Sequence, residues 1–268
     1  MCAAVTPASR HQPLRVALSI AGSDSGAGAG IQADLLTFAA HGVFGTTAIT
    51  CLTAQNPGGV TGVHAAPGSI VRQQIEAVCS YFPVRAAKTG MLFNADIISS
   101  VCDALEADPI PLVVDPVMVA TSGAVLLRED AIAVMTSRLF PLAVLITPNL
   151  DEGAVLLGRK PEGPGELADA ALTLAHRFGT HVLLKGGHLR GRRLVDVLAA
   201  PDGRVREYGG QRIHGVNTHG SGCTLSSAIA ARLALGSDLA RAVAQGRNYL
   251  RSGMVRPLRV ARRRFIAH

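Results

Sequence analysis

The chain has 268 residues, of which 48% are hydrophobic, 17% are charged and 4% are aromatic. This composition excludes a largely disordered chain and can build one large core, as α/β domains of this length often do. The apolar residues are mainly Ala, Val, Leu and Ile, which favours a buried parallel sheet covered by Ala-rich helices.

The net charge of +7 does not by itself indicate a nucleic-acid partner. Basic residues gather in one loop (Arg190, Arg192 and Arg193) and at the C-terminus, without the interleaved aromatic residues that stack on bases. A phosphorylated substrate explains the charge equally well. We therefore expect no nucleic-acid partner.

The five cysteines are scattered and form no CxxC pair, which argues against a zinc site and a disulfide framework. The first thirty residues do not resemble a signal peptide, and no apolar run is long enough to span a bilayer. These features predict a soluble, cytoplasmic protein without membrane contact.

Strands and helices are expected to alternate after a polar leader, residues 1–14. In chain order, the first half gives a strand at Val16–Ala21, a helix at Gly28–Ala40, a strand at Thr46–Leu52, a helix at Ser69–Cys79 capped by Ser69, a short strand at Arg85–Ala87, a helix at Ala95–Leu105, a strand at Pro111–Asp115 and a helix at Glu129–Arg138. The second half gives a strand at Ala143–Thr147, helices at Leu150–Leu157 and Gly165–Phe178, a strand at His181–Lys185, a hairpin of Leu194–Ala199 and Arg204–Tyr208, and helices at Cys223–Leu235 and Leu239–Met254. We predict one α/β domain, residues 15–255, with a mostly parallel sheet between two layers of helices, and a basic tail at residues 256–268.

Polar residues and glycines follow six of the predicted strands. They are Gly22 to Asp24, Thr53 to Asn56, Lys88 to Gly90, Asp115, the pair Asn149 and Glu152, and Lys185 to His188. Ligands of parallel sheets bind at the carboxyl ends of the strands. The sequence therefore predicts a functional site along this edge.

The segment Asn217 to Thr224 carries the strongest chemical signal. Gly220 and Gly222 let backbone N–H groups turn towards one point just before a helix, where the helix dipole also favours an anion. Cys223 lies in the first turn, where the same field favours a thiolate. The structural alternative is a glycine loop followed by a small buried cysteine.

A second glycine-rich segment, Ala21 to Gly30, follows the first strand. It lacks the Gly-Lys-Ser/Thr ending of a Walker A loop and fits the dinucleotide fingerprint poorly. Its glycines are expected to let the backbone approach a flat ligand, and a flexible loop is the alternative.

Asn149 and Glu152 at a helix start lie on one face and could orient magnesium through water, although an ordinary capped helix has the same pattern. Asp115 ends a buried strand, where an unpaired carboxylate is costly, so it should meet a cation or neighbouring donors. Lys185 ends another apolar strand and could meet ATP phosphates.

These segments resemble the hydroxymethylpyrimidine/phosphomethylpyrimidine kinases of thiamine biosynthesis, a branch of the ribokinase superfamily. The resemblance runs from about Val16 to Tyr249 and rests on AGSDSGAGAGIQAD, TAQN, AAKTGML, DPVMVATSG, LITPNLDE, VLLKGGHL and NTHGSGCTLSSAIAA. It implies a ribokinase-like fold, a homodimer, and transfer of phosphate from ATP with Mg²⁺ to 4-amino-5-hydroxymethyl-2-methylpyrimidine and then to its monophosphate.

The resemblance also assigns roles to individual residues. The pyrimidine site would comprise Gly22, Ala29, Asp34, Gln55, Met91 and Val117, with Asp34 and Gln55 bonding the aminopyrimidine edge. Cys223 would be the catalytic base, and Gly220, Ser221 and Gly222 would stabilise the transferring phosphoryl group. Lys185, Asn149 and Thr218 would contact the nucleotide, and Glu152 and Asp115 the metal.

Some positions depart from the family pattern. Thr121 stands where the family often has lysine, Ala27 where glycine is usual, and Ser221 where threonine is common; the arginine-rich Pro257–His268 replaces the usual tail and is expected to be disordered or packed differently. Three other functions stay open: a pyridoxal-type vitamin kinase, a pyrimidine-binding paralogue without turnover, and a Cys–His hydrolase built on Cys223 with His219 or His214.

Overall fold

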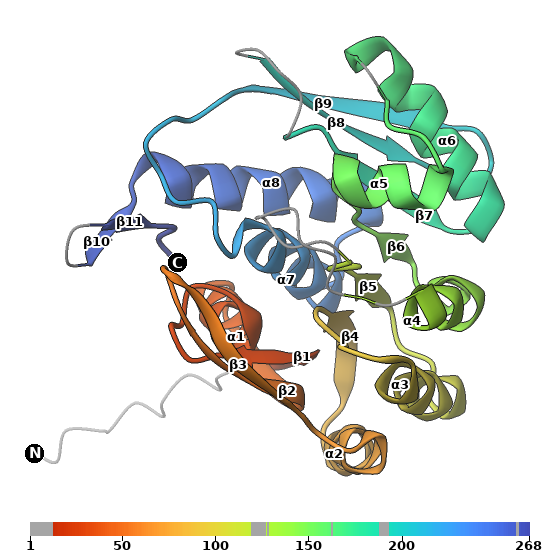
Figure 1. The fold of residues 1–268 in the computed structure, drawn as a ribbon, viewed down its shortest axis with the longest axis vertical. Coiled ribbons are helices and arrows are strands. Elements are labelled where there is room, and N and C mark those ends of the chain that lie inside the picture. Colours follow the sequence, from red (N-terminus) through yellow and green to blue (C-terminus); the bar gives the residue numbers. More distant parts are fainter. Residues whose placement is uncertain (1–12, 119–126, 128, 162, 188–192, 261–262) are drawn as a thin grey trace, which may run out of the picture.

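The computed structural model describes the chain except at residues 1–12, 119–126, 128, 162, 188–192 and 261–262. Within the described residues, nine strands form one sheet in the order β3-β2-β1-β4-β5-β6-β7-β8-β9 (Figure 1). Six strands in its centre are parallel: β2 (Val43–Asn56), β1 (Arg15–Asp24), β4 (Val84–Thr89), β5 (Leu112–Val114), β6 (Leu145–Ile146) and β7 (His181–Lys185). The edges add antiparallel pairs with β3 (Gly59–Ala65), and with β8 (Arg193–Ala199) and β9 (Val205–Gln211). The predicted α/β class is confirmed.

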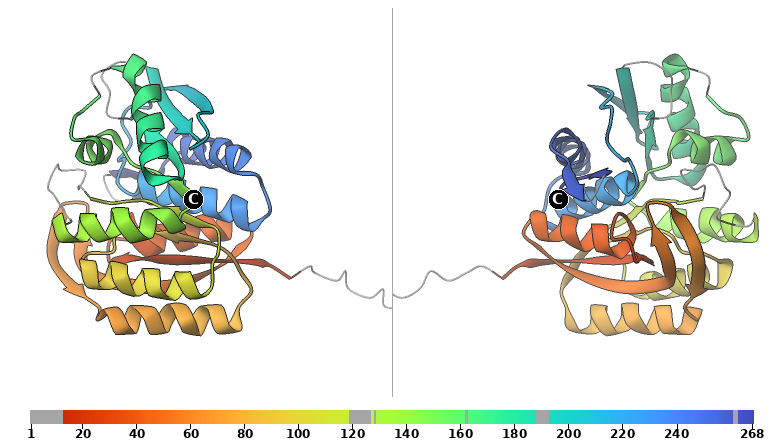
Figure 2. Two further views of the ribbon diagram at one scale, coloured as in Figure 1. Left: turned by 90° about the vertical axis from the view of Figure 1, so that its right-hand side faces the viewer. Right: turned by 60° about the vertical axis from the view of Figure 1, so that its left-hand side comes forward.

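Helices cover both faces of the sheet (Figure 2). Leu18 and Ile20 of β1 belong to the core that contains α2 (Gly68–Tyr81), α3 (Ala95–Ala107), α4 (Glu129–Val134), α5 (Leu150–Leu157) and α6 (Leu167–Phe178). Ala17 belongs to the opposite core, with α1 (Gly30–Ala40), α7 (Ser221–Ala234) and α8 (Leu239–Val255). Because successive side chains of a strand point to opposite faces, one apolar run supplies both cores.

Most predicted elements are present, and the differences have local causes. α2 begins at Gly68, so the predicted cap at Ser69 is wrong: its N-cap is Pro67, without a side-chain hydrogen bond. The helix predicted at Glu129–Arg138 is α4 followed by a π-helical turn, Met135–Leu139. The sequence did not predict β3, because most of its residues are exposed and show no apolar alternation.

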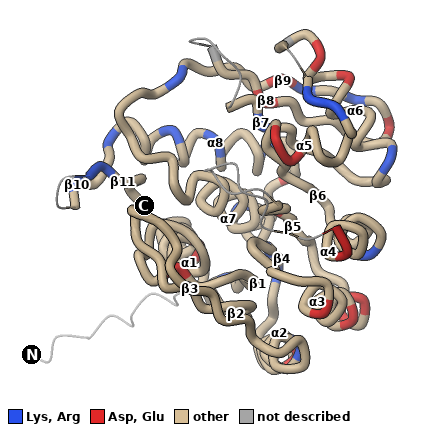
Figure 3. Tube along the Cα trace, in the orientation of Figure 1, with Lys and Arg blue, Asp and Glu red and all other residues tan. Residues whose placement is uncertain are grey.

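The basic tail folds back onto the domain. Its strands β10 (Leu258–Val260) and β11 (Arg263–Phe265) pair as an antiparallel ribbon, and Ile266 is buried. His268 Nδ1 lies 3.2 Å from Thr37 Oγ1 of α1. Lys and Arg occur along α8 and in this ribbon, whereas both signs of charge are seen on the side of the molecule that carries α3 to α6 (Figure 3). Different packing, rather than disorder, therefore holds for the described residues of the tail.

No helix in the described ranges is long and apolar enough to cross a membrane.

Candidate active site

The loop before α7 and the first turn of this helix lie next to the ends of several parallel strands. It reaches the end of β1, where His219 Nε2 lies 3.0 Å from Asp24 Oδ2. It also reaches β5 and β7, since a Cβ atom added at Gly222 would lie 2.8 Å from Asp115 Oδ2 and 3.6 Å from Lys185 Nζ. The carboxyl edge of the sheet thus brings together segments that are far apart in the sequence.

The start of α7 has the geometry of an anion site. Gly220 caps the helix in the left-handed region (φ 80°), and a Cβ atom there would collide with the carbonyl oxygen of Gly28. The helix begins at Ser221, and the Thr224 amide donates to the Gly220 carbonyl (2.8 Å). The amides of residues 222 and 223 have no intrahelical acceptor, so they and the helix dipole favour an anionic group here.

Asp115 and Lys185 form an ion pair beside this loop. Lys185 Nζ lies 3.0 Å from Asp115 Oδ1, which also accepts a hydrogen bond from Thr147 Oγ1 (3.3 Å). Burial opposes the charge on Lys185, but the carboxylates of Asp115 and Glu152 outweigh it and raise the Lys185 pKa. The buried carboxylate therefore has the cation that its position required.

Asn149 and Glu152 form a capping box at the start of α5. The Asn149 side chain accepts from the amides of Asp151 and Glu152, and Glu152 Oε2 accepts from the Asn149 amide (2.8 Å). Glu152 Oε1 accepts from the Met118 amide (3.2 Å). Burial raises the Glu152 pKa to about 7. Asn149 and Glu152 therefore cap the helix in the ordinary way, and the Glu152 side chain is a second carboxylate near Lys185.

Cys223 lies half-buried in the first turn of α7. Burial raises the pKa of its thiol to about 11, although the Lys88 cation and a hydrogen bond with the Gly30 backbone lower it. Burial therefore opposes the thiolate that the helix field was expected to favour, and the role of Cys223 stays a prediction.

Asp34, which was expected to bind the pyrimidine, lies inside the protein between β1, β4 and α7. Its side chain is fully buried and accepts hydrogen bonds from Ser19 Oγ (2.6 Å), Ser227 Oγ (2.6 Å) and Lys88 Nζ (2.9 and 3.0 Å). Burial opposes the charge on Lys88, but Asp34 raises the Lys88 pKa. This correction makes Asp34 of α1 an internal partner of Lys88 and of Ser227, which lies one turn of α7 after Cys223, instead of a ligand contact.

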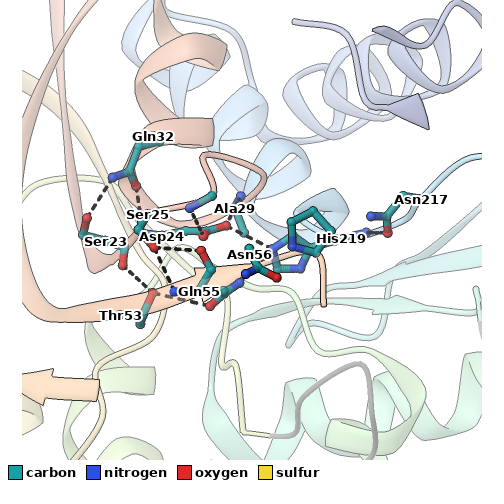
Figure 4. A network of polar contacts seen from close by, with 12 residues as sticks. Ser23, Asp24, Ser25, Ala29, Gln32, Thr53, Gln55, Asn56, Asn217 and His219 are labelled. Atoms are coloured by element: carbon teal, nitrogen blue, oxygen red, sulfur yellow. Dashed lines mark hydrogen bonds and ion pairs between the residues drawn. The ribbon is translucent and has the colours of Figure 1, made fainter. Parts of the chain in front are cut away.

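Asp24, His219 and Gln55 form a polar network between the two glycine-rich segments (Figure 4). Asp24 is 4% exposed; its Oδ1 accepts from the Gly26 amide (2.8 Å) and its Oδ2 from the Ala29 amide (2.9 Å). His219 Nε2 lies 2.9 Å from the side-chain nitrogen of Gln55. No individual role was predicted for Asp24, because a pairing across 195 positions leaves no pattern in the sequence. In the sequence, this pair was indicated only by the position of Asp24 and His219 in the two glycine-rich segments.

The other predicted pyrimidine residues lie near the ends of β1, β4 and β5. A Cβ atom at Gly22 would approach Met91 Cβ (3.9 Å), and Met91 accepts from Thr50 Oγ1 (2.6 Å) through its carbonyl. Val117 has φ 45°, an unusual conformation for a β-branched residue. Strained backbone of this kind clusters at ligand sites. Ala27 also has a positive φ (56°), which explains why glycine suits that position.

Three further predictions have different outcomes. Thr218 is exposed, and its carbonyl accepts from the Ser221 amide (3.0 Å). Thr121 lies outside the described residues. The Cys–His hydrolase is not supported, because His219 directs Nε2 towards Asp24 and Gln55, and His214 is exposed.

Comparison with known proteins gives consistent similarities. A family model described as phosphomethylpyrimidine kinase matches residues 24–267. The chain is 49% identical over 241 residues to a hydroxymethylpyrimidine/phosphomethylpyrimidine kinase of Rhizobium meliloti, covering 89% of this chain and 90% of that protein. The crystal structure of phosphomethylpyrimidine kinase from Clostridium difficile aligns with a TM-score of 0.79 at 39% identity, covering 88% of this chain and 98% of the other. The ADP complex of Bacillus subtilis pyridoxal kinase aligns with a TM-score of 0.88 at 32% identity, covering 96% and 98%.

Proposed function

The chain belongs to the phosphomethylpyrimidine kinase family, and on this premise we propose that its site transfers the γ-phosphate of ATP to the hydroxymethyl group of 4-amino-5-hydroxymethyl-2-methylpyrimidine. The enzyme is a phosphotransferase of thiamine biosynthesis. The monophosphate would be the second acceptor in the same site. ATP is the donor proposed here, in line with the ADP complex of the similar pyridoxal kinase.

Pyrimidine binding is assigned to residues around the β1 loop. Gln55 is half-buried at the end of β2 and offers an amide to the heterocycle. Gly22, where an added Cβ atom would lie 2.7 Å from Cys51 Sγ, would line the site with its backbone, and Ala29, Met91 and Val117 would supply apolar contact. A flat heterocycle with polar edges needs this combination of apolar faces and few polar groups.

Phosphoryl transfer is assigned to the start of α7. The segment Gly220, Ser221 and Gly222 would stabilise charge on the transferring group, chiefly through the Gly222 amide, because the Ser221 amide already donates to the Thr218 carbonyl. Lys185, Asn149 and Thr218 would hold the nucleotide. Cys223 would accept the proton of the acceptor alcohol. Only the thiolate can accept this proton, so the thiol proton of Cys223 would first have to pass to water. Because the transition state of phosphoryl transfer is loose, the alcohol proton can leave late, and a small thiolate fraction is compatible with the role.

The described residues could hold a magnesium ion together with the phosphates of the substrate, but not as a site built from protein side chains alone. In the part of the chain that the structure describes, no three His, Cys, Asp or Glu side chains cluster as metal ligands. Mg²⁺ is commonly held by one or two carboxylates together with substrate phosphates, and Asp115 and Glu152 can supply these carboxylates. When bound, Mg²⁺ would neutralise charge on the phosphates.

A homodimer is part of the proposal. β3 is the outermost strand on its side of the sheet, and Val60 (54% exposed), Val63 (41%) and Leu52 (54%) on this β2–β3 edge are unusually open for large apolar residues. Exposed apolar edges are suited to pairing with another chain.

The observation that supports the function most is the placement of Cys223 next to free helix-start amides and the Asp115–Lys185 pair. A coupled assay with ATP, Mg²⁺ and the hydroxymethylpyrimidine tests it by ADP formation. Tight pyrimidine binding without ADP would instead support the non-catalytic paralogue.

Pyridoxal is a second candidate acceptor, because the TM-score to the pyridoxal kinase, 0.88, exceeds that to the phosphomethylpyrimidine kinase, 0.79. The same assay with pyridoxal should give a lower kcat/KM than with the pyrimidine. A higher value would reverse the order of the two substrates.

A further inference from the structure

The Asp24–His219 contact restricts where the imidazole proton lies. The Asp24 carboxylate accepts two backbone N–H groups and lies 3.0 Å from His219 Nε2. An ionised carboxylate has no proton to donate, so a hydrogen bond at this distance requires the proton on Nε2. The alternative, with a lone pair on Nε2, would place two acceptors against each other.

The proton on His219 Nε2 also determines the orientation of the Gln55 side-chain amide. Its amide lies 2.9 Å from the same Nε2 atom. Since Nε2–H is a donor, the group of Gln55 that faces it must be the carbonyl oxygen, and the Nε2–H is shared between Asp24 and Gln55. The two ends of a glutamine amide have nearly the same shape, and their partners decide the orientation. The Gln55 NH2 group then points away from His219.

The surroundings of Gln55 leave that NH2 group available. Thr53 Oγ1, which lies 3.5 Å from the other end of the amide, already donates to the Ser23 carbonyl (2.8 Å) and can only accept weakly at that distance. The Gln55 backbone is held separately, by reciprocal hydrogen bonds with Ser25 Oγ (2.7 and 2.8 Å). The backbone is thus fixed by Ser25 and the amide orientation by His219.

We propose that Asp24 and His219 are a positioning pair that holds Gln55 as a hydrogen-bond donor towards a ring nitrogen of the pyrimidine. The inference rests on the proposed function and deepens it, because it selects the ring nitrogen, an acceptor, rather than the exocyclic amine, a donor. Asp24 and His219 do not touch the substrate in this arrangement. They act through Gln55, and they also join the β1 loop to the loop before α7.

The test is a matched pair of substitutions at His219. The amide nitrogen of glutamine can occupy the position of imidazole Nε2, whereas that of asparagine corresponds to Nδ1. At saturating MgATP, His219→Asn should raise the KM for the hydroxymethylpyrimidine about tenfold, the usual cost of one hydrogen bond, with kcat and the KM for ATP changed much less. His219→Gln should stay within about threefold of the wild type. His214→Asn, an exposed histidine on the same segment, is the control and should change neither constant.

A double-mutant cycle separates positioning from general damage. If His219 acts through Gln55, adding His219→Asn to Gln55→Ala should not raise the pyrimidine KM further. Equal KM increases in His219→Asn and His219→Gln, additive effects in the cycle, or a fall in kcat alone would overturn the proposal. The proposal stays testable even if His219→Asn fails to fold, because a tenfold rise in the pyrimidine KM of His219→Gln alone would also contradict it. A wild type without pyrimidine-dependent ADP formation would refute the proposed function itself.

Discussion

In the proposed reaction Cys223 takes a proton from the acceptor alcohol, so its own thiol proton must leave first. Burial raises the pKa of its thiol to about 11. Only the thiolate reacts with iodoacetamide, and below its pKa the thiolate fraction grows about tenfold with each pH unit. We therefore expect the alkylation rate of Cys223, followed by mass spectrometry, to rise by about this factor per unit between pH 7 and pH 9.5 without levelling off.

Two comparisons make this prediction specific. Cys102 is fully buried with a pKa raised to about 12, so it should remain unmodified in the folded protein. The double variant Lys88→Met/Asp34→Asn removes the cation that lowers the Cys223 pKa while avoiding an unpaired buried carboxylate. It also removes the Asp34 charge, which raises this pKa, but the effect of Lys88 is the larger of the two, so alkylation at a given pH should be slower. A rate that levels off near pH 7 would show that Cys223 is a thiolate in the free enzyme.

At the scale of the element, α7 offers a matched pair of glycines. Gly220 precedes the helix (φ 80°) and Gly236 follows it (φ 88°). An alanine at either position takes on an unfavourable positive φ, at a cost of about 1 kcal/mol. Only at Gly220 does the new Cβ atom also collide, with the Gly28 carbonyl, whereas Gly236 has open space around it.

Gly220→Ala should therefore lower kcat by at least about 100-fold, because the displaced amides no longer stabilise the phosphoryl group. Gly236→Ala should lower the melting temperature by about 2–4 °C and leave kcat nearly unchanged. Steady-state kinetics and thermal unfolding of both variants provide the measurement. Equal kcat values for the two would show that the α7 amides do not act on the reacting group.

Elements and contacts differ in how far the sequence could predict them. Strands such as Val16–Ala21 were predictable because an apolar run buried on both faces is visible in the sequence. β3 was not, because it pairs through its backbone while its side chains stay exposed. The site was predictable as a set of strand ends, but the partner of each charge was not. Asp34 was expected at the ligand and instead pairs with Lys88, 54 positions away.

For the molecule as a whole, the proposed homodimer would form through the β3 edge. Val63→Lys places a charge on this apolar edge and should shift the protein from dimer to monomer, as measured by light scattering across a range of concentrations. Val205→Lys on β9, the opposite edge of the sheet, is the control and should leave the mass unchanged. A wild type that is monomeric at all concentrations, or a dimer unaffected by Val63→Lys, would contradict this assembly.

The two acceptors distinguish a role of Cys223 as the base for the alcohol from a role in packing alone. The hydroxymethyl group must lose a proton when it attacks, whereas the monophosphate offers an oxygen that is already ionised at pH 8. Purified Cys223→Ala should bind the pyrimidine as the wild type does and lose at least about 100-fold in kcat with the alcohol, but much less with the monophosphate. Equal losses with both acceptors, or unchanged turnover of the alcohol, would contradict the account.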